Sequence, residues 1–329
     1  MITPAITQSE SQARGKLAGW ILSEYLVLGL TVAMFLALAP FTPGLASGAN
    51  LLNILGYLLP LLIVAIGMTV VMITGGIDLS VTSIIALTSV VGAGAMTGKS
   101  GIAATPTGLI SMLALGVALG AANGLVVAFL RLPGFIVTLA SRMFISGFAI
   151  WLTQSKSIYN LPTSFLAIGK QLPIALALTV ATALVAHFTL RRTMYGRWLY
   201  AAGQNATTAH ISGVPVRAVT FAAYVVSGLC AALASILLTG RMETGSPVLG
   251  HEILMDVIGA TVVGGTSLFG GKGKIAWTFF GVLFLAVLDT ALNLLNLSQF
   301  SITMAKGSVI LLAAVLDAMR NRFIVRGSL

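Results

Sequence analysis

The sequence predicts an all-α polytopic membrane protein with about ten transmembrane helices. Of its 329 residues, 57% are hydrophobic and only 8% are charged, and the mean hydropathy is +1.03. A soluble domain carries about 25% charged residues, so this composition excludes a water-exposed surface over most of the chain. The apolar runs are continuous over about 20 residues, which suits spanning helices rather than barrel strands.

The apolar runs follow one another with short polar or glycine-rich breaks. The first run follows Arg14 and Lys16, and we expect an uncleaved helix there, because the polar segment before it is long for a signal peptide. Residues 1–20 then form a cytoplasmic N-terminal segment, 21–320 a single transmembrane domain and 321–329 a cytoplasmic tail. The expected spans are 21–40, 51–74, 78–97, 103–130, 134–153, 171–190, 218–239, 253–269, 275–296 and 303–319.

The distribution of Lys and Arg predicts that both ends of the chain are cytoplasmic. With the N-terminus inside, twelve basic residues fall in inside segments and four outside, which is the asymmetry of a multi-pass membrane protein. The net charge of +10 therefore reflects topology; nucleic-acid binding is excluded because no dense basic cluster carries interleaved aromatics. The inside residues are Arg14, Lys16, Arg131, Arg191, Arg192, Arg197, Arg217, Lys272, Lys274, Arg320, Arg322 and Arg326, and the outside residues are Lys99, Lys156, Lys170 and Arg241.

The stretch GAGAMTGKS at residues 92–100 is similar to a phosphate-binding loop but has the wrong spacing. That loop needs four residues between its glycine and the Gly-Lys pair, whereas three or five are present here. It also follows an apolar span instead of a strand, and Lys99 is expected outside. The sequence predicts neither an enzyme nor ATP hydrolysis by this chain itself, and it shows no metal-ligand spacing and no cofactor motif.

The longest charged inside segment, residues 191–217, is expected to be a docking element on the cytoplasmic face. It is too short for a domain and too patterned for a plain connector. Asn205 is placed to cap short helical turns, which Gly213 and Pro215 would end. An ordinary amphipathic linker remains the alternative.

A second feature is TGGIDLSVTS at residues 74–83, where Asp78 can start and cap a new helix. Its two readings are a capped hairpin turn and a gate or pathway lining. Polar residues within spans either bond a neighbouring helix or line a pathway; they are Asn123, Asp289, Asn293, Asn296 and Lys306. An outside group, expected to be a solvated loop or a contact for a soluble partner, contains Glu243, His251, Glu252 and Asp256.

Several motifs together resemble the ribose-type permeases of ATP-binding-cassette (ABC) importers. They are GGIDLSVTSIIALTSVVGA, YGRWLYAAGQNATTAHISGVPV, VSGLCAALASIL, GGTSLFGGKGK and KGSVILLAAVLDA, in the family's order from about residue 50 to 320, with Thr82 where the family usually has Gly. The resemblance implies a permease domain in a bacterial inner membrane, among membrane lipid. It also implies import of a monosaccharide or related polyol, with a cytoplasmic ATP-binding subunit, a periplasmic sugar-binding protein and a second permease, either a copy or a paralogue.

The resemblance also assigns expected roles to residues. ATPase coupling is expected at Gly196, Arg197, Gly203, Asn205, Ala206, Ala209, Ser212 and Gly213. The small residues from Gly203 to Gly213 would permit close approach of the backbone to the partner. A gate or pathway is expected at Gly75, Gly76, Asp78, Ser80, Asn123 and Asn293.

The alternative from another class is an ion-coupled secondary sugar carrier. Such a carrier usually needs carboxylates within the membrane, and Asp289 is the one good candidate in a late span. A carrier would leave the patterned segment 191–217 unexplained. Composition alone is also compatible with a channel, whereas intramembrane catalysis lacks a visible cluster of acids or nucleophile and base.

Overall fold

The computed structural model describes residues 26–97 and 103–326, with side chains to residue 315. Every named secondary-structure element in this part is a helix. The sequence-based expectations for Arg14, Lys16 and Lys99 lie outside the described residues. In chain order the helices are α2 (Leu26–Leu38), α3 (Gly48–Ile73), α4 (Val81–Met96), α5 (Ala104–Phe129), α6 (Gly134–Thr153), α7 (Thr163–Lys170), α8 (Leu172–Arg192), α9 (Met194–Gln204), α10 (Ala206–Ile211), α11 (Val216–Met242), α12 (Ile253–Val263), α13 (Ile275–Leu294) and α14 (Gln299–Arg326).

Each predicted span contains a helix, but the helices differ in length. Among the described residues, α3, α5, α6, α8, α11 and α13 are long and apolar enough to cross a membrane, whereas α2, α4, α12 and the apolar part of α14 are shorter. The expected eighth span, 253–269, is helical only to Val263, because Gly264 and Gly265 end α12 there. Eleven residues rise only ~16 Å, about half of the hydrocarbon core. The all-helical class is confirmed, and the count of ten spans stays a prediction.

Helix α3 is the centre of the bundle. It packs against α8, α11, α12 and α13, and most of its apolar length is buried. Helices α5 and α11 approach each other through glycines: a β-carbon on Gly228 would lie 2.2 Å from the carbonyl oxygen of Gly116, and one on Gly120 would lie 2.4 Å from that of Tyr224. Such close packing explains part of the high glycine content, because lipid provides no hydrophobic drive between helices.

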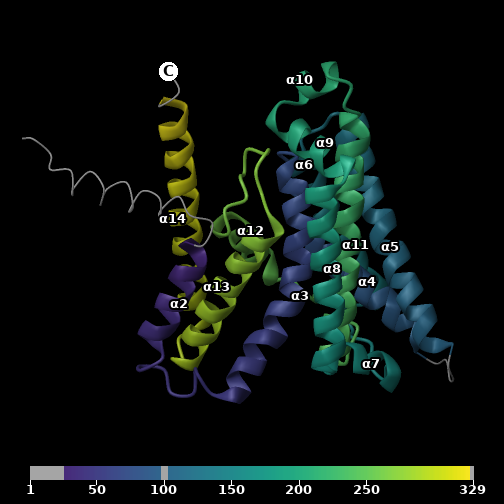
Figure 1. Ribbon diagram of the computed structural model, residues 1–329. Coiled ribbons are helices and arrows are strands. Elements are labelled where there is room, and N and C mark those ends of the chain that lie inside the picture. The colour runs from purple at the N-terminus through teal and green to yellow at the C-terminus, as the bar shows by residue number, and fades with distance from the viewer. Residues whose placement is uncertain (1–25, 98–102, 327–329) are drawn as a thin grey trace, which may run out of the picture.

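The short helices define the two ends of the bundle. Helices α9 and α10 lie at one end, where α14 also ends, and α7 lies at the other (Figure 1). We call these the α10 end and the α7 end. Helices α6 and α8 are the least buried of the long helices and carry large exposed apolar side chains, such as Met143, Phe144 and Val185. Their outer faces therefore suit contact with lipid.

Candidate functional site

Asp78 is the centre of a buried polar cluster that joins three parts of the fold. Its Oδ1 accepts hydrogen bonds from the N–H and Oγ of Ser80, at 3.0 and 2.5 Å, and its Oδ2 accepts one from Ser227 Oγ in α11, at 2.7 Å. Asn123 Nδ2 in α5 donates to Ser80 Oγ at 2.8 Å. Asp78, Ser80 and Ser227 are fully buried and Asn123 is 4% exposed. The structure thus brings together three residues that the sequence assigned to a gate or pathway.

The donors around Asp78 explain how its carboxyl group is accommodated away from water. Three donors from Ser80 and Ser227 replace the hydration that burial removes, and an unsatisfied acceptor would cost about 1–3 kcal/mol. The expectation that Asp78 caps the following helix was wrong. Helix α4 begins at Val81, after Ser80, and Asp78 instead binds the N–H two residues ahead within the preceding turn.

The turn before Asp78 is held by neighbouring helices. Gly75 has a φ of +82°, a conformation that glycine adopts readily, which supports the expected sharp turn. Thr138 Oγ1 in α6 donates to the carbonyl of Ile77 and accepts from the N–H of Leu79, both at 3.1 Å. Gly76 faces Tyr224, whose hydroxyl would lie 2.6 Å from an added β-carbon. Sequence reasoning missed Thr138 and Ser227, and their only local signal is a hydroxyl residue within an apolar run.

Three glycine-rich segments meet at the α10 end. The carbonyl oxygen of Ile73, at the end of α3, accepts the N–H of Gly271 at 2.8 Å. A β-carbon on Gly203 of α9 would lie 1.8 Å from that same oxygen, and one on Gly270 would lie 2.7 Å from the carbonyl of Gly203. We call this the glycine junction. It connects the segment 191–217 to the end of α3 and to loop 264–274 through backbone contacts that tolerate no side chain.

The segment 191–217 contains two short helices, α9 and α10. The expectation that Asn205 caps short helical turns anticipated the second of them. Asn205 Oδ1 accepts the N–H of Thr208 at 2.9 Å and so caps α10, whereas α9 is capped by Thr193. Gly213, at φ +83°, follows the end of α10 and donates its N–H to the carbonyl of His210. The cap at Asn205 and the stop at Gly213 are confirmed. The larger helix α9 was not anticipated.

The residues expected to contact an ATPase divide into two groups by exposure. Gly196 and Ala209 are buried and Gly203 lies in the glycine junction, so their small size serves packing within this chain. The exposed residues are Arg197, Asn205, Ala206, Ser212 and Gly213. Beside them, Ile211 is 82% exposed, which is unusual for a branched apolar side chain. The cytoplasmic coupling role itself stays a prediction.

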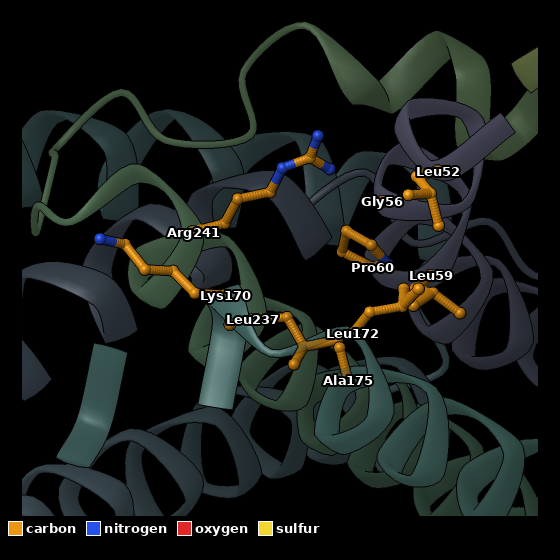
Figure 2. Close-up of a pocket in the computed structure, with 10 residues that line it drawn as sticks. Leu52, Gly56, Leu59, Pro60, Lys170, Leu172, Ala175, Leu237 and Arg241 are labelled. Carbon is orange, nitrogen blue, oxygen red and sulfur yellow. The ribbon is translucent and has the colours of Figure 1, made fainter. Parts of the chain in front are cut away.

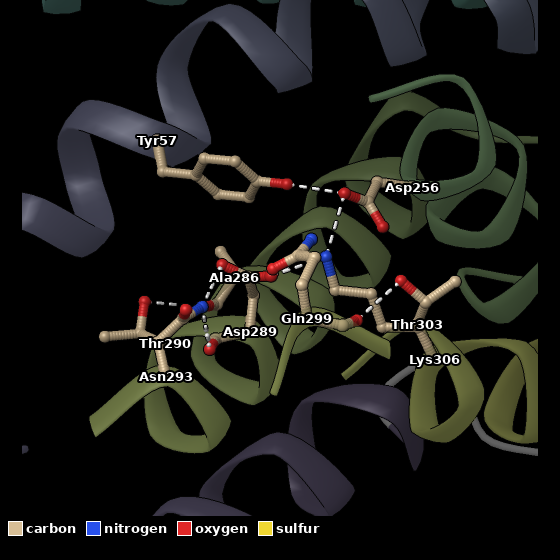
Figure 3. A network of polar contacts seen from close by, with 9 residues as sticks. All are labelled: Tyr57, Asp256, Ala286, Asp289, Thr290, Asn293, Gln299, Thr303 and Lys306. Carbon is tan, nitrogen blue, oxygen red and sulfur yellow. Dashed lines mark hydrogen bonds and ion pairs between the residues drawn. The ribbon is translucent and has the colours of Figure 1, made fainter. Parts of the chain in front are cut away.

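Asn293 lies apart from the Asp78 cluster, in a second polar network. Its Nδ2 donates to Asp289 Oδ2 at 3.1 Å, and Asp289 Oδ1 pairs with Lys306 Nζ at 2.5 Å. Lys306 also contacts Asp256 Oδ2 at 3.1 Å, and that oxygen accepts the hydroxyl of Tyr57 at 2.5 Å. Figure 3 shows the side chains converging. The network joins α3, α12, α13 and α14 near the α7 end.

The placement of Asp256 corrects an expectation from the sequence. Its side chain is 6% exposed and lies in the first turn of α12, so it belongs neither to a solvated loop nor to a partner contact. Lys306 is 12% exposed between its two carboxylates. The missed signal was the presence of Asp256, Asp289 and Lys306 in the last three apolar runs, since charges within a membrane usually pair.

A cavity of about 350 Å³ opens near the α7 end (Figure 2). Helices α3, α7, α8 and α11 supply its mainly apolar lining, and Arg241 and Lys170 supply its two cations. Lys170 pairs with Glu243 at 2.7 Å, and the Arg241 guanidinium lies over Gly56, which has no side chain to obstruct it. The cavity is separate from the Asp78 cluster, because none of its lining residues belongs to that cluster.

The family model for the permease component of the branched-chain amino acid transport system matches residues 50–317. The chain belongs to this permease family. A permease component is not catalytic, and ATP hydrolysis lies in separate subunits. Membership implies an ATP-binding subunit and a periplasmic binding protein as partners, and it places the permease in the inner membrane.

Named relatives cover almost the whole permease. It is 34% identical to the ribose import permease protein of Escherichia coli (strain K12), over 94% of this chain and 98% of the relative. It is 35% identical to the L-arabinose transport system permease protein of the same strain, over 92% of this chain and 93% of that protein. The ribose import permease protein of Bacillus subtilis (strain 168) is 36% identical, over 89% of this chain and 92% of that protein. No solved structure matches the chain.

Proposed function

We propose that this permease forms the translocation pathway of an ABC importer for a monosaccharide or a related polyol, delivered by a periplasmic sugar-binding protein. The observation that carries the proposal is the similarity to ribose and L-arabinose permeases over about nine-tenths or more of both chains. The buried Asp78 cluster brings serine, asparagine and aspartate side chains together in the interior of the bundle. Hydroxyl and amide groups of this kind suit a sugar's hydroxyl groups.

The proposed topology has ten spans, with the α10 end and both termini in the cytoplasm. Basic residues expected inside, such as Arg191, Arg197 and Lys272, lie in or beside α8, α9 and loop 264–274, whereas Lys170 and Arg241 lie near α7. This separation supports the orientation that the charge count predicts. The end of α14 at the α10 end supports a cytoplasmic C-terminus (Figure 1).

Helix α10 is the proposed contact with the ATP-binding subunit. Its exposed face carries Ile211, an apolar residue suited to a pocket in a partner, and Asn205 and Ser212 lie at its two ends. Movement of α9 and α10 would displace the end of α3 through the glycine junction, because the backbones of Gly203 and Ile73 are in direct contact. Ile73 is five residues before Asp78, so the coupling helices act close to the proposed gate.

A second permease, either an identical copy or a paralogue, completes the proposed transporter. Differently tagged copies of this chain, expressed together and extracted in mild detergent, test the identical pair. Retention of one tag through the other supports it. Loss of that retention while the ATP-binding subunit still copurifies favours a paralogue.

The import proposal is tested by copurification and uptake together. The permease is expressed with its natural partners, and the cells are supplied with radiolabelled pentoses, hexoses and polyols. Ile211→Asp places a charge in the expected contact. We expect loss of both the ATP-binding subunit and sugar uptake with unchanged thermal stability, because residue 211 is 82% exposed.

Met242→Asp is the matched control. Met242 is also an exposed apolar residue, at 56%, but it ends α11 at the opposite end of the bundle from α10. The control should retain both partner and uptake. If Ile211→Asp keeps its ATP-binding subunit, the coupling assignment is wrong; if uptake requires a proton gradient and no ATPase, the chain acts as an ion-coupled carrier.

A further inference from the structure

Tyr224 places an unpartnered hydroxyl beside the turn that carries Asp78. It lies on α11, its side chain is fully buried, and its hydroxyl has no hydrogen-bond partner among the described residues. Most buried donors in native proteins are paired, because an unpaired donor loses its bonds to water without replacement. A buried threonine can turn its hydroxyl toward a carbonyl of its own helix, whereas the phenol of a tyrosine reaches beyond its helix. A protein partner for this hydroxyl therefore comes from another segment.

Glycines on two other segments make room for the hydroxyl. We call residues 74–80 the gate turn. A β-carbon on Gly76 of this turn would lie 2.6 Å from the hydroxyl, and one on Gly134, in the first turn of α6, would overlap it. Ser227, three residues after Tyr224 on the same face of α11, binds Asp78 Oδ2. One face of α11 thus approaches the gate turn at two places.

Helix α11 is tightly held at Tyr224, so the gate turn is the part that can move. A β-carbon on Gly120 of α5 would lie 2.4 Å from the carbonyl oxygen of Tyr224, and one on Gly124 would lie 3.1 Å from its β-carbon. These close contacts leave the tyrosine little room to shift. The gate turn, in contrast, bends at Gly75, where φ is +82°, and it follows directly from the end of α3.

The carbonyl of Ile77 is an acceptor that the gate turn offers to this hydroxyl. It lies 3.7 Å from the β-carbon position of Gly134 that the Tyr224 hydroxyl overlaps. Its present donor is Thr138 Oγ1, at 3.1 Å, but that hydroxyl has one hydrogen and lies closer, at 2.8 Å, to the carbonyl of Gly134. The Ile77 carbonyl therefore has the capacity to accept a second donor.

We propose that Tyr224 is a positioning residue for the gate, whose hydroxyl donates to the carbonyl of Ile77 once the gate turn has moved. A bond that is made in only one of two states shifts the equilibrium toward that state. Ile77 is four residues after Ile73 of the glycine junction, so displacement of α9 reaches the gate turn along the end of α3. The inference rests on the proposed gate and the proposed coupling role of α10, and it adds the group that holds the second state.

Tyr224→Phe keeps the ring and removes the hydroxyl, so it tests the two states separately. Removal of a buried donor that has no partner should raise the melting temperature of the ATP-free complex in detergent by about 2–4 °C. Removal of the bond made in the second state should lower sugar uptake about tenfold, because one hydrogen bond is lost from one state only. A purely structural residue would not raise stability and lower transport together.

Hydrogen–deuterium exchange follows the gate turn itself, whichever sugar is carried. The N–H groups of residues 74–80 are compared in the permease with its partners, with and without ATP. In the unaltered permease ATP should change their protection, and in Tyr224→Phe this change should be largely lost. A gate turn that does not respond to ATP overturns the inference. If the unaltered permease takes up no sugar, the import proposal fails, whereas exchange and melting still decide the role of Tyr224.

Tyr159→Phe and Tyr200→Phe are the matched controls. Tyr159 is 62% exposed, so its variant should change neither the melting temperature nor the uptake. Tyr200 already donates to the carbonyl of Gly273 at 2.7 Å, so its variant should lower the melting temperature, the opposite of Tyr224→Phe. No rise in Tyr224→Phe would show that its hydroxyl is already bonded, for instance to water, and would overturn the inference. Uptake and exchange equal to those of the unaltered permease would overturn it as well.

Gly134→Ala tests where the hydroxyl lies. A β-carbon on Gly134 would overlap the Tyr224 hydroxyl but would lie 3.5 Å from the ring carbon Cζ, which is an ordinary contact. Gly134→Ala alone should therefore lower the melting temperature, and adding Tyr224→Phe should restore most of the loss. Absence of this rescue would show that the hydroxyl does not lie between the gate turn and α6, and would remove the basis of the inference.

Discussion

Gly203 in α9 lies against the carbonyl oxygen of Ile73 so closely that a β-carbon on residue 203 would be 1.8 Å from that oxygen. The same oxygen accepts the N–H of Gly271, so α3, α9 and loop 264–274 meet at one backbone atom. Contact between backbones is stiffer than contact between long side chains, which can change rotamer. The glycine junction is therefore the firmest link between the exposed α10 surface and the turn that carries Asp78.

Gly203→Ala should disrupt this junction. Overpacking costs about 1–3 kcal/mol, and here the obstacle is backbone that must move. We expect a lower melting temperature in detergent and reduced uptake. Gly56→Ala is the comparison: its β-carbon would lie 2.7 Å from Arg241 Nη1, but that atom ends a flexible side chain and can move away. Equal losses in the two variants would contradict the role given to the junction.

Ser227→Ala should weaken the Asp78 cluster. It removes the donor to Asp78 Oδ2 and leaves a buried carboxylate oxygen unsatisfied, at a cost of about 1–3 kcal/mol. Thermal unfolding measures the loss. In the control variant, Ser111→Ala, the lost hydroxyl bonds only the carbonyl of Gly108 within its own helix, so little change is expected. A stable Ser227→Ala variant would show that water replaces the serine.

Lys306→Met should be strongly destabilising. It leaves Asp256 and Asp289 buried without their counter-charge, and breaking a buried pair in this way costs about 3–5 kcal/mol. The triple variant Lys306→Met/Asp256→Asn/Asp289→Asn removes the stranded charges and should recover much of the melting temperature. A triple variant that is less stable than the single one would show that the network stabilises the fold mainly through its hydrogen bonds.

Asp289→Asn separates an ATP-driven permease from an ion-coupled carrier. Lys306 keeps Asp256 as a partner in this variant, so the fold should survive with a small loss of stability. An ATP-driven permease should retain most of its uptake, and a protonophore should act only through the cell's ATP supply. Abolished uptake in a folded, ATPase-bound Asp289→Asn variant would favour proton coupling.

Local features of the fold could be predicted from the sequence, because they depend on neighbouring residues. The apolar runs placed the helices, and Asn205 and Gly213 marked the limits of α10. Residues 74–83 gave one prediction that the structure supports, the sharp turn at Gly75, and one that was wrong, the helix cap at Asp78. Turn residues indicate where a chain bends, but not which nearby N–H an acid will bind.

The contacts between distant segments could not be predicted. Asp78 and Ser227 are 149 residues apart, and nothing near either residue indicates the other. Asp256 was grouped with Glu243, His251 and Glu252 as a solvated loop or a partner contact, whereas the structure buries its side chain in the first turn of α12. The small residues of segment 191–217 showed that something approaches closely, but not that the neighbour of Gly203 is its own chain.

The network around Lys306 also has a consequence for the synthesis and membrane insertion of the chain. Asp256 and Asp289 leave the ribosome before Lys306, and each unpaired acid costs up to about 2.5–3.5 kcal/mol within the bilayer. Helices α12 and α13 therefore settle fully only when α14 arrives with the compensating charge. A nascent chain released before residue 306 would keep two stranded acids, a defect that membrane quality control can detect.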